Sequence, residues 1–415
     1  MILTLLLMSV YYKVTQVFLP QHKPMFQIPR SVVGGLKKCD HIRWLIFFCV
    51  VVIFSVGLVG EAKASWYDSN WGYRKPITIS NNTASALTNF QVSVAVTFVA
   101  SMNIDFSDLR FTASDGTTLL NSWLEAKTNS ASATVWVKIP SIPASDSATI
   151  YMYYGNGNAT DASNIDNTFL FGDDFPGTSL DTDTKWSVKT GGFGGEPTVS
   201  GGIMSLTTYL NGIDSKTFTL PGDTILEASV KIGNAATWGR ALGAVTDNAA
   251  NKPNILFFFP DVAAGVELSS DLGSSRIVAA SRDDQNSDST TVTNHDDSYH
   301  RYVIKYTESS QADYYYDNTQ ATINTAGAVP PATRELHPSF QFNQADSGAD
   351  QGIFADWIFV RKYASADPSV STGSEQTSGQ GVPEFKTWVW ALTMLISLGF
   401  IYHFHRQIAA SSRGV

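Results

Sequence analysis

The sequence predicts an all-β protein that contains two β-sandwiches in tandem, and three observations lead to that fold class. Apolar and polar residues alternate over 134–139 and again over 225–232, which is the period of a strand with one buried face. From residue 65 to about 370 no long stretch has the helical period. Breaks rich in Gly, Asn and Asp separate the short apolar runs, and strands at this spacing are typical of β-sandwiches.

The strands divide into two groups, and this division sets the predicted domain boundaries. The first group ends near Asn156, a polar stretch follows over 157–167, and the second group begins at Phe169. We therefore expect the first sandwich over 65–160 and the second over 168–370.

The second group contains the clearest individual strands. Residues 302–306 and 313–316 flank a short polar turn and predict a hairpin, and 353–361 predict a long final strand. After Pro368 the composition changes to Ser, Thr, Gly, Gln and Glu. Residues 371–381 are therefore expected to form a flexible spacer, because such a stretch cannot bury a core.

Residues 1–64 have the parts of a secretory signal peptide in their usual order. A basic flank precedes an almost wholly apolar run over 44–60, and small residues follow at Ala62 and Ala64, the two positions that a signal peptidase reads. Cleavage is expected directly after Ala64. Met25 as the true start would give a signal of ordinary length, and the alternative to cleavage is an N-terminal anchor that stays attached.

Residues 382–415 read as a surface-sorting signal with three parts: a short motif, an apolar segment over 387–402 and a small basic tail. The apolar segment is shorter than the roughly 20 residues that cross a bilayer comfortably. The whole resembles the PEF-type C-terminal signals that an archaeosortase- or exosortase-like transpeptidase cleaves, and the alternative is an ordinary C-terminal membrane anchor. The motif consists of Val382, Pro383, Glu384 and Phe385.

Both ends therefore predict an exported protein of the cell surface or outer envelope, anchored in the membrane before any C-terminal processing. The only cysteines, Cys39 and Cys49, lie in the segment expected to be removed, so the mature chain has no disulfide and no thiolate nucleophile. Residues 65–382 carry 18 Lys and Arg against 34 Asp and Glu, and this negative charge disfavours nucleic acid as a partner.

Five motifs follow one another in order over about 90 residues of the first half. They are Trp71-Gly72-Tyr73-Arg74-Lys75-Pro76-Ile77-Thr78-Ile79, Asp108-Leu109-Arg110-Phe111 with Asp115-Gly116, Trp123-Leu124-Glu125, Val135-Trp136-Val137-Lys138 and Tyr151-Met152-Tyr153-Tyr154-Gly155-Asn156. On these motifs the first half resembles the uncharacterised extracellular domains known as DUF2341, and this resemblance implies architecture and location more than activity.

Three features mark the second half: Asp173-Asp174-Phe175, the hairpin around 302–316 and the closing strand 356–363. On these features it resembles a concanavalin-A-like jelly roll of the laminin-G type. Some jelly rolls are glycosidases, and those of this fold carry Glu-x-Asp-x-(x)-Glu on one strand, because alternate residues share a face. No such cluster occurs in the chain, and Glu227 is expected to be solvated. The sequence therefore predicts that the protein is not an enzyme and requires no cofactor.

Two kinds of binding site are candidates. In concanavalin-A-like domains a structural Ca²⁺ often lies where the first and last strands run side by side, so Asp174 and Asp356 are the pair to test; the alternative is that each accepts bonds from backbone amides. Sugar sites on sandwiches use exposed aromatic rings with polar side chains around them. The ligand-binding candidates are Trp238, Arg240, Tyr314 and Tyr316, whereas Trp123, Trp136 and Trp357 are expected to serve core or inter-domain packing.

The function that these observations favour is a surface-anchored, non-enzymatic protein that binds extracellular glycan or another surface through its lectin-like jelly roll. Two alternatives stay open. One is a glycan-degrading enzyme of the glycoside hydrolase class with an unfamiliar carboxylate pair, and the other is a structural surface-layer component. The expected partners are a glycan or surface protein, signal peptidase, the sorting transpeptidase and the membrane.

Overall fold

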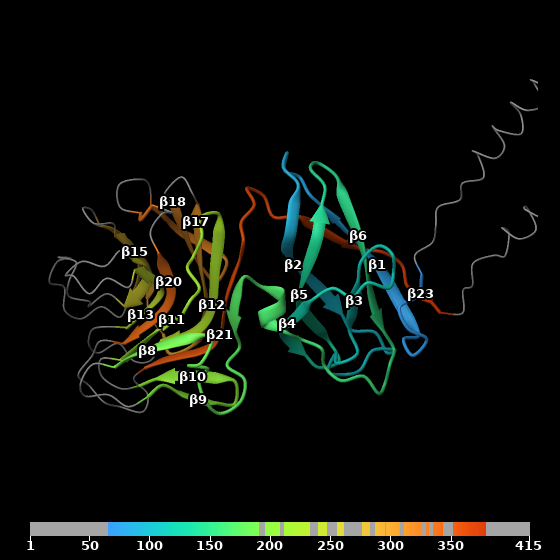
Figure 1. Ribbon diagram of the computed structural model, residues 1–415, viewed down its shortest axis with the longest axis horizontal. Coiled ribbons are helices and arrows are strands. Elements are labelled where there is room, and N and C mark those ends of the chain that lie inside the picture. The colour runs from blue at the N-terminus through green and yellow to red at the C-terminus, as the bar shows by residue number, and fades with distance from the viewer. Residues whose placement is uncertain are drawn as a thin grey trace, which may run out of the picture. The chain divides into compact units, whose positions relative to one another are not determined.

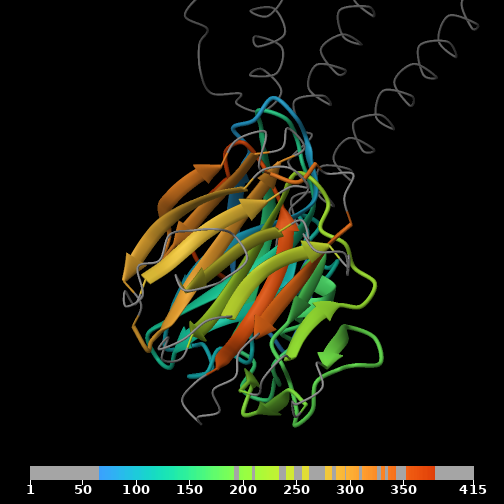
Figure 2. The ribbon, with the colours of Figure 1, turned by 90° about the vertical axis from the view of Figure 1, so that its left-hand side faces the viewer.

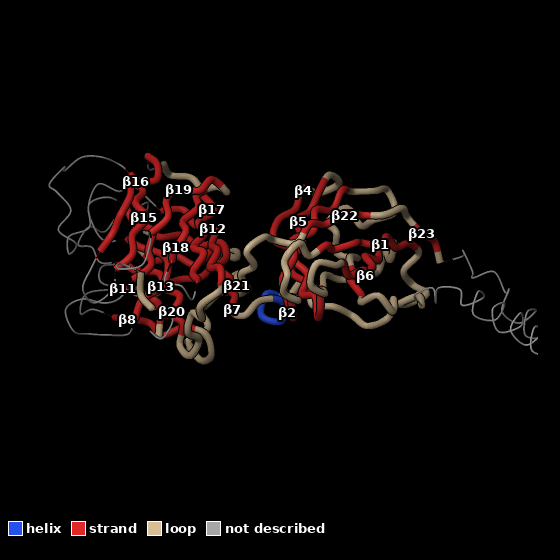
Figure 3. The backbone as a smooth tube through the Cα atoms, turned by 90° about the horizontal axis from the view of Figure 1, so that it is seen from above, coloured by secondary structure: helices blue, strands red, loops and turns tan. Residues whose placement is uncertain are grey.

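The computed structural model confirms the all-β fold class for the part of the chain that it describes, as two sandwiches (Figures 1 and 3). The predicted signal peptide, including Ala62 and Ala64, and the predicted sorting signal, from Val382 to Phe385 and beyond, lie outside the described residues. Among the described helices, none is long and apolar enough to span a bilayer. The described residues are 65–190, 196–207, 211–232, 240–246, 255–260, 276–282, 287–294, 296–307, 311–324, 329–331, 335–342 and 352–378.

The first sandwich places a three-stranded sheet, in the order β2-β5-β4, against a sheet in the order β22-β1-β6-β3 that β23 extends beside β1. Alternation determines which side chains are buried: Val92, Val94 and Val96 of β2 point into the core opposite β5. Its first strands are β1 (Tyr73–Ser80), β2 (Leu87–Thr97), β3 (Arg110–Thr112), β4 (Ser122–Thr128), β5 (Ser132–Ile142) and β6 (Ser147–Tyr154), followed by the single helical turn α4 (Ile165–Thr168).

The last two described strands, β22 (Ser369–Thr372) and β23 (Gln376–Thr377), return to the first sandwich and pair antiparallel with β1. Part of the predicted 371–381 spacer is therefore strand, and that prediction was wrong. Of the four β22 side chains only Val370 is even partly buried. Backbone bonds to an open strand edge hold this segment, so a polar composition does not prevent it from pairing.

The second sandwich is the jelly roll, inserted in sequence between β6 and β22. One sheet runs β19-β18-β17-β12-β21-β10-β9 with β7 also on β21, and the other runs β16-β15-β14-β13-β20-β11-β8. In Figure 2 the strands of the jelly roll run across the view. The strands are β7 (Phe171–Asp173), β8 (Trp186–Thr190), β9 (Thr198–Ser200), β10 (Ile203–Leu206), β11 (Asn211–Ser215), β12 (Thr224–Ile232), β13 (Arg240–Thr246), β14 (Ile255–Pro260), β15 (Arg276–Arg282), β16 (Ser287–Asn294), β17 (Tyr299–Thr307), β18 (Gln311–Tyr316), β19 (Thr319–Asn324), β20 (Leu336–Phe342) and β21 (Ile353–Lys362).

The sheet that contains β12, β17 and β21 has two different faces. Its inner face supplies the jelly-roll core, with Leu226, Ala228 and Val230 of β12 fully buried. Its outer face carries the intervening residues of the same strands, which we call the outer face of the β12 sheet. A β-bulge opposite Ser229 and Val230 leaves Asp356 as an extra residue of β21, and bulges of this kind redirect a side chain.

Candidate functional site

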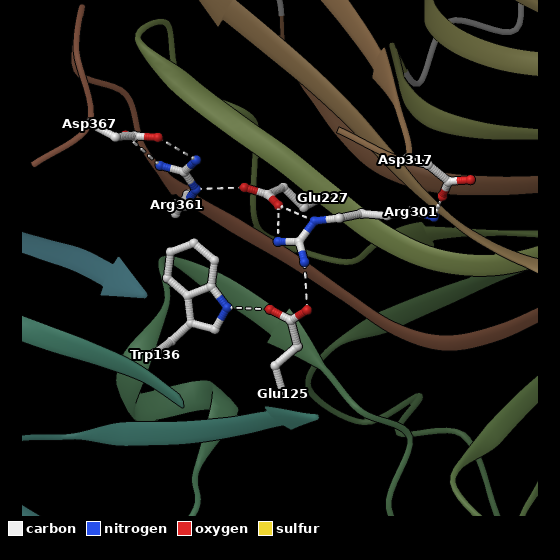
Figure 4. Close-up of polar contacts among 7 residues, drawn as sticks. All are labelled: Glu125, Trp136, Glu227, Arg301, Asp317, Arg361 and Asp367. Carbon is white, nitrogen blue, oxygen red and sulfur yellow. Dashed lines mark hydrogen bonds and ion pairs between the residues drawn. The ribbon is translucent and has the colours of Figure 1, made fainter. Parts of the chain in front are cut away.

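The first sandwich covers part of the outer face of the β12 sheet, and charged side chains meet there (Figure 4). The carboxylate of Glu227, 2% exposed, accepts bonds from Arg361 Nε at 2.6 Å and from Arg301 Nε at 2.9 Å. The Nη1 atom of Arg301 also reaches Glu125 of the first sandwich at 2.5 Å, and Glu125 accepts from the Trp136 indole at 2.5 Å. Arg301 therefore joins one carboxylate from each sandwich.

Burial alone would raise the pKa of Glu227, but the guanidinium groups of Arg361 and Arg301 outweigh it and hold that pKa below its ordinary value. The sequence-based prediction that Glu227 is solvated was wrong. An outward position on a strand faces water only where nothing covers the sheet, and the first sandwich covers this position. Glu227 is joined to the first sandwich through Arg301, which also contacts Glu125, so it belongs to the ion pairs at the junction.

An aromatic cluster packs beside the ion pairs and confirms the expectation for three tryptophans. Phe169 and Phe359 stack with ring centroids 4.0 Å apart. The indole of Trp123 meets the ring of Trp357 edge-on at 5.8 Å, and such pairs are the preferred aromatic geometry. The full cluster is Trp123, Trp136, Ile165, Phe169, Trp357 and Phe359.

Gln91 adds a neutral connection between the sandwiches. It is 1% exposed, its side-chain amide donates to Thr168 O at 3.1 Å, and its carbonyl accepts from the backbone N–H of Lys362 at 3.1 Å. One side chain thus satisfies backbone groups of the α4 turn and of β21. The junction combines ionic, aromatic and amide contacts, which fixes the first sandwich on this sheet.

At the rim of the junction, Asp174 and Asp356 lie within electrostatic reach of one another. Burial raises the pKa of Asp356, and the charges of Asp174 and then Glu125 raise it further. Asp174 accepts a bond from the indole Nε1 of Trp123 at 2.9 Å. The structure thus brings together the two carboxylates that the sequence singled out.

These two carboxylates do not by themselves form a calcium shell. Ca²⁺ takes six to eight oxygen ligands, and within the described ranges no group of three His, Cys, Asp or Glu side chains is placed to hold a metal ion. One oxygen of Asp174 is already bonded to Trp123, and Glu125 is bonded to Arg301. The structural Ca²⁺ site stays a prediction.

Beside Asp356, three side chains form a row across neighbouring strands, which we call the rim row. Lys231 of β12 is in register with Tyr299 of β17 on one side and with Phe354 of β21 on the other. The Tyr299 ring is 43% exposed, and the Lys231 ammonium lies 4.7 Å from the centre of the Phe354 ring. Burial and then the charge of Asp356 raise the pKa of the Tyr299 hydroxyl. An exposed aromatic ring, a cation and a half-buried carboxyl meet here.

The structure does not place the other ligand-binding candidates in the rim row. Trp238 and the side chain of Arg240 lie outside the described residues. Tyr314 is fully buried in the jelly-roll core, so its prediction as a ligand contact was wrong: pairing with Ile304 turns it inward.

Of the two remaining tyrosines of β18, Tyr316 is half-buried and stacks on the His300 ring at 4.6 Å. Tyr315 alone of the three points outward, and the Lys305 ammonium lies 4.3 Å from its ring. The alternation of 299–306 placed Tyr299 outward as well, and this was the signal in the sequence that could have identified the rim row.

His300 is held between two carboxylates. Its Nε2 contacts Asp296 at 2.7 Å and its Nδ1 contacts Asp317 at 2.7 Å. Burial lowers the pKa of His300, but the two aspartates outweigh it and raise that pKa above the ordinary value. Both ring nitrogens are occupied, so the imidazole fastens the loop before β17 to the turn after β18.

A second polar group lies on the other sheet. Burial raises the pKa of Asp214, which accepts a bond from Ser339 Oγ at 2.5 Å and lies 3.5 Å from Lys189 Nζ. Nearby, Ser215 Oγ donates to Phe218 O at 2.5 Å and lies 3.3 Å from His337 Nδ1, which also lies 2.8 Å from Ser215 O. This group stabilises strand and turn geometry.

The model of the DUF2341 family, "Domain of unknown function", matches residues 105–189. The match covers four of the five motifs used above and begins after the first, which ends at Ile79. It also extends into β8 of the jelly roll, beyond the boundary at 160 that the sequence suggested. No curated protein sequence matches the chain.

Solved structures match the chain at low similarity. An endo-acting O-glycanase of human gut microbiota is 14% identical with a TM-score of 0.36, over 47% of this chain and 100% of that one. A Bacillus licheniformis β-glucanase is 14% identical with a TM-score of 0.36, over 46% and 97%. The Mycobacterium tuberculosis protein Rv0315, described as a pseudo β-1,3-glucanase, is 13% identical with a TM-score of 0.36, over 47% and 99%.

The prediction that the chain is not an enzyme is corrected, because the structures that it resembles include glycan-cleaving enzymes. The lack of a Glu-x-Asp-x-(x)-Glu strand rules out only one arrangement of carboxylates. Residues 105–189 thus match the DUF2341 family model, and the second sandwich of the fold is a jelly roll.

Proposed function

We propose that the protein is exported, displayed at the cell surface, and recognises extracellular glycan at the rim row of its jelly roll. The observation that carries this proposal is the exposed Tyr299 ring in register with Lys231 and Phe354, beside the carboxyl of Asp356. Aromatic faces pack against the apolar faces of sugar rings, and charged side chains nearby bind the hydroxyl groups. The first sandwich covers a neighbouring part of the same sheet face, around Glu227 and Arg301.

A glycan array probed with the full-length protein in detergent tests this site. Tyr299→Ala is expected to weaken glycan binding about two- to tenfold, because an aromatic contact contributes roughly 0.5–1.5 kcal/mol. Tyr315→Ala is the matched control, since it removes an outward tyrosine of the same sheet that lies outside the rim row. Equal losses in both variants, or binding to no glycan at all, would contradict the proposal.

A second function at the same place is glycan cleavage, favoured by one observation. A carboxyl whose pKa is raised can donate a proton to a leaving oxygen while a neighbouring carboxylate stays ionised, as glycoside hydrolases require. Asp356 has the raised pKa and Asp174 is its neighbour. Release of reducing ends from polysaccharide, lost in both Asp356→Asn and Asp174→Asn, would support cleavage. Glycan binding without such release would leave recognition as the function.

Calcium is the alternative role for this carboxylate pair. Isothermal titration of the chelated protein with CaCl₂ separates the roles. Saturable binding that both Asp→Asn variants abolish supports a metal site. A titration without any heat of binding excludes a Ca²⁺ site and leaves glycan contact as the role of the two carboxyls.

Processing of the two ends completes the proposed route to the surface. Signal peptidase would cut after Ala64, the apolar segment 387–402 would hold the chain in the membrane, and a sorting transpeptidase would act at Val382 to Phe385. Mass spectrometry of protein extracted from the cell surface tests each step. An N-terminus at Ser65 is expected, and a C-terminal peptide that ends at Val415 would show that the sorting motif is not cut.

A further inference from the structure

Two sequences in the chain fit the acceptor pattern for N-linked sugar, Asn-x-Ser/Thr with x not proline. They are Asn81-Asn82-Thr83 and Asn158-Ala159-Thr160. Both lie in the first sandwich, one after β1 and the other after β6. The pattern alone does not distinguish them, but the structure places their asparagines in opposite environments.

The Asn81 side chain is closed off from any reaction. It is 2% exposed, and its Nδ2 donates to Ser85 O at 2.8 Å and to Pro143 O at 2.9 Å. Its Oδ1 accepts from both the backbone N–H and the hydroxyl of Thr83, at 2.9 and 2.8 Å. Because the acceptor nitrogen and the required hydroxyl are both used inside the loop, this asparagine serves the fold.

The Asn158 side chain is presented to solvent instead. Asn158 and Thr160 are both exposed. In the described part of the chain no group accepts a hydrogen bond from the side-chain amide of Asn158. The turn around them is held by its backbone: Asn158 N donates to Asn156 Oδ1 at 3.1 Å, and Arg110 Nη2 donates to Thr160 O at 2.7 Å. The turn keeps its shape without using the side chain of Asn158.

We propose that Asn158 is an N-glycosylation site of this protein and that Asn81 is not. The sugar donor is a polyprenyl-phosphate-linked oligosaccharide, used by a membrane transferase that recognises the Thr160 hydroxyl. Nδ2 of Asn158 forms a bond to the anomeric carbon of the first sugar, and the bond from that carbon to the phosphate oxygen breaks. Nδ2 releases one proton, and the lipid phosphate leaves with the bonding electrons. The proposal requires export but does not depend on glycan recognition at the rim row.

Glycopeptide mass spectrometry on the full-length protein recovered from the envelope of cells that export it tests the assignment. Electron-transfer fragmentation keeps an N-linked sugar on its residue, so the peptides that contain Asn158 and Asn81 are read separately. The expected result is an added glycan mass on the first and none on the second. The bare Asn81 peptide is the internal control for selection by burial.

Three variants sharpen the test. Asn158→Gln and Thr160→Ala are expected to lose the added mass completely, and Thr160→Ser, which keeps the hydroxyl, is expected to retain it. Both residues are exposed, so the fold is expected to be preserved in all three variants and the protein to be recovered at wild-type level. An unmodified Asn158 in the exported wild-type protein, or sugar on Asn81, would overturn the proposal.

Discussion

Glu227 and Asp356 both belong to the outer face of the β12 sheet, yet their surroundings shift the pKa values of the two carboxyls in opposite directions. Glu227 lies under the first sandwich between Arg301 and Arg361, and its pKa is lowered despite burial. Asp356 lies at the rim beside Asp174, and its pKa is raised. On one sheet face, coverage together with arginines produces a docking contact. Partial coverage without arginines leaves a carboxyl with its proton held more tightly.

The largest expected effect comes from neutralising the covered carboxylate. Glu227→Gln removes the buried carboxylate that Arg361 and Arg301 share and leaves them only Asp367 and Glu125 as charged partners. Breaking a buried pair costs roughly 3–5 kcal/mol. Urea unfolding followed by tryptophan fluorescence measures the free energy of unfolding. Glu335→Gln, at an exposed carboxylate, is the control and should change it by less than about 0.5 kcal/mol. Equal small losses would show that the ion pairs contribute little to docking.

The neutral connection is expected to contribute less. Gln91→Leu keeps most of the side-chain volume but leaves Thr168 O and the Lys362 N–H without their junction partner. An unsatisfied buried polar group costs about 1–3 kcal/mol. The same urea titration measures the loss. If Gln91→Leu loses as much free energy of unfolding as Glu227→Gln, the ion pairs of Glu227 stabilise the junction no more than the neutral hydrogen bonds of Gln91.

His300 offers a pH-dependent comparison on a neighbouring strand. Its pKa is raised from 6.5, so its stabilising contribution is complete below pH 6.5 and is lost as pH rises through the raised value. Exposed ion pairs of this kind contribute at most about 1 kcal/mol. Thermal unfolding of wild type and His300→Asn from pH 5.5 to 9 should converge as pH rises. A constant difference in Tm across that range would contradict the stabilisation of protonated His300 by Asp296 and Asp317.

The smallest change in stability is expected at Asp356, and here the variant should be more stable than wild type at neutral pH. Its raised pKa means that the protonated form favours the fold, so stability is highest below pH 3.8 and falls as pH rises through the raised value. Asp356→Asn should therefore be more stable than wild type at pH 7 and equal to it near pH 3. Differential scanning fluorimetry at the two pH values measures this. A variant that is less stable at pH 7 would indicate that the carboxylate has a favourable partner.

Strand alternation in the sequence was sufficient to predict the all-β class and the packing role of Trp123, Trp136 and Trp357, because both follow from local spacing. It was insufficient for Glu227, since an outward residue becomes buried only when another sandwich lies over it. The return of 369–377 to β1 was missed for a related reason. Pairing along a strand edge depends on backbone groups, which every residue has, and leaves little trace in composition.

The aromatic candidates illustrate the same limit. Three consecutive tyrosines must place at least one ring outward, but only the pairing of β18 with β17 decides which. That pairing selects Tyr315 and buries Tyr314. Asp174 and Asp356 were found from the sequence because a fold-level rule brings first and last strands together. The extra residue at the bulge, which sets where Asp356 lies, has no signal in the sequence.

Because β22 and β23 return to the first sandwich, two covalent connections join the jelly roll to that sandwich, residues 155–170 and 363–368. A protease that cuts only one of them leaves the module joined to the chain through the other, and the junction contacts keep the cut ends together. Releasing this module from the chain would therefore need two separate cuts, and a single cut would leave it attached.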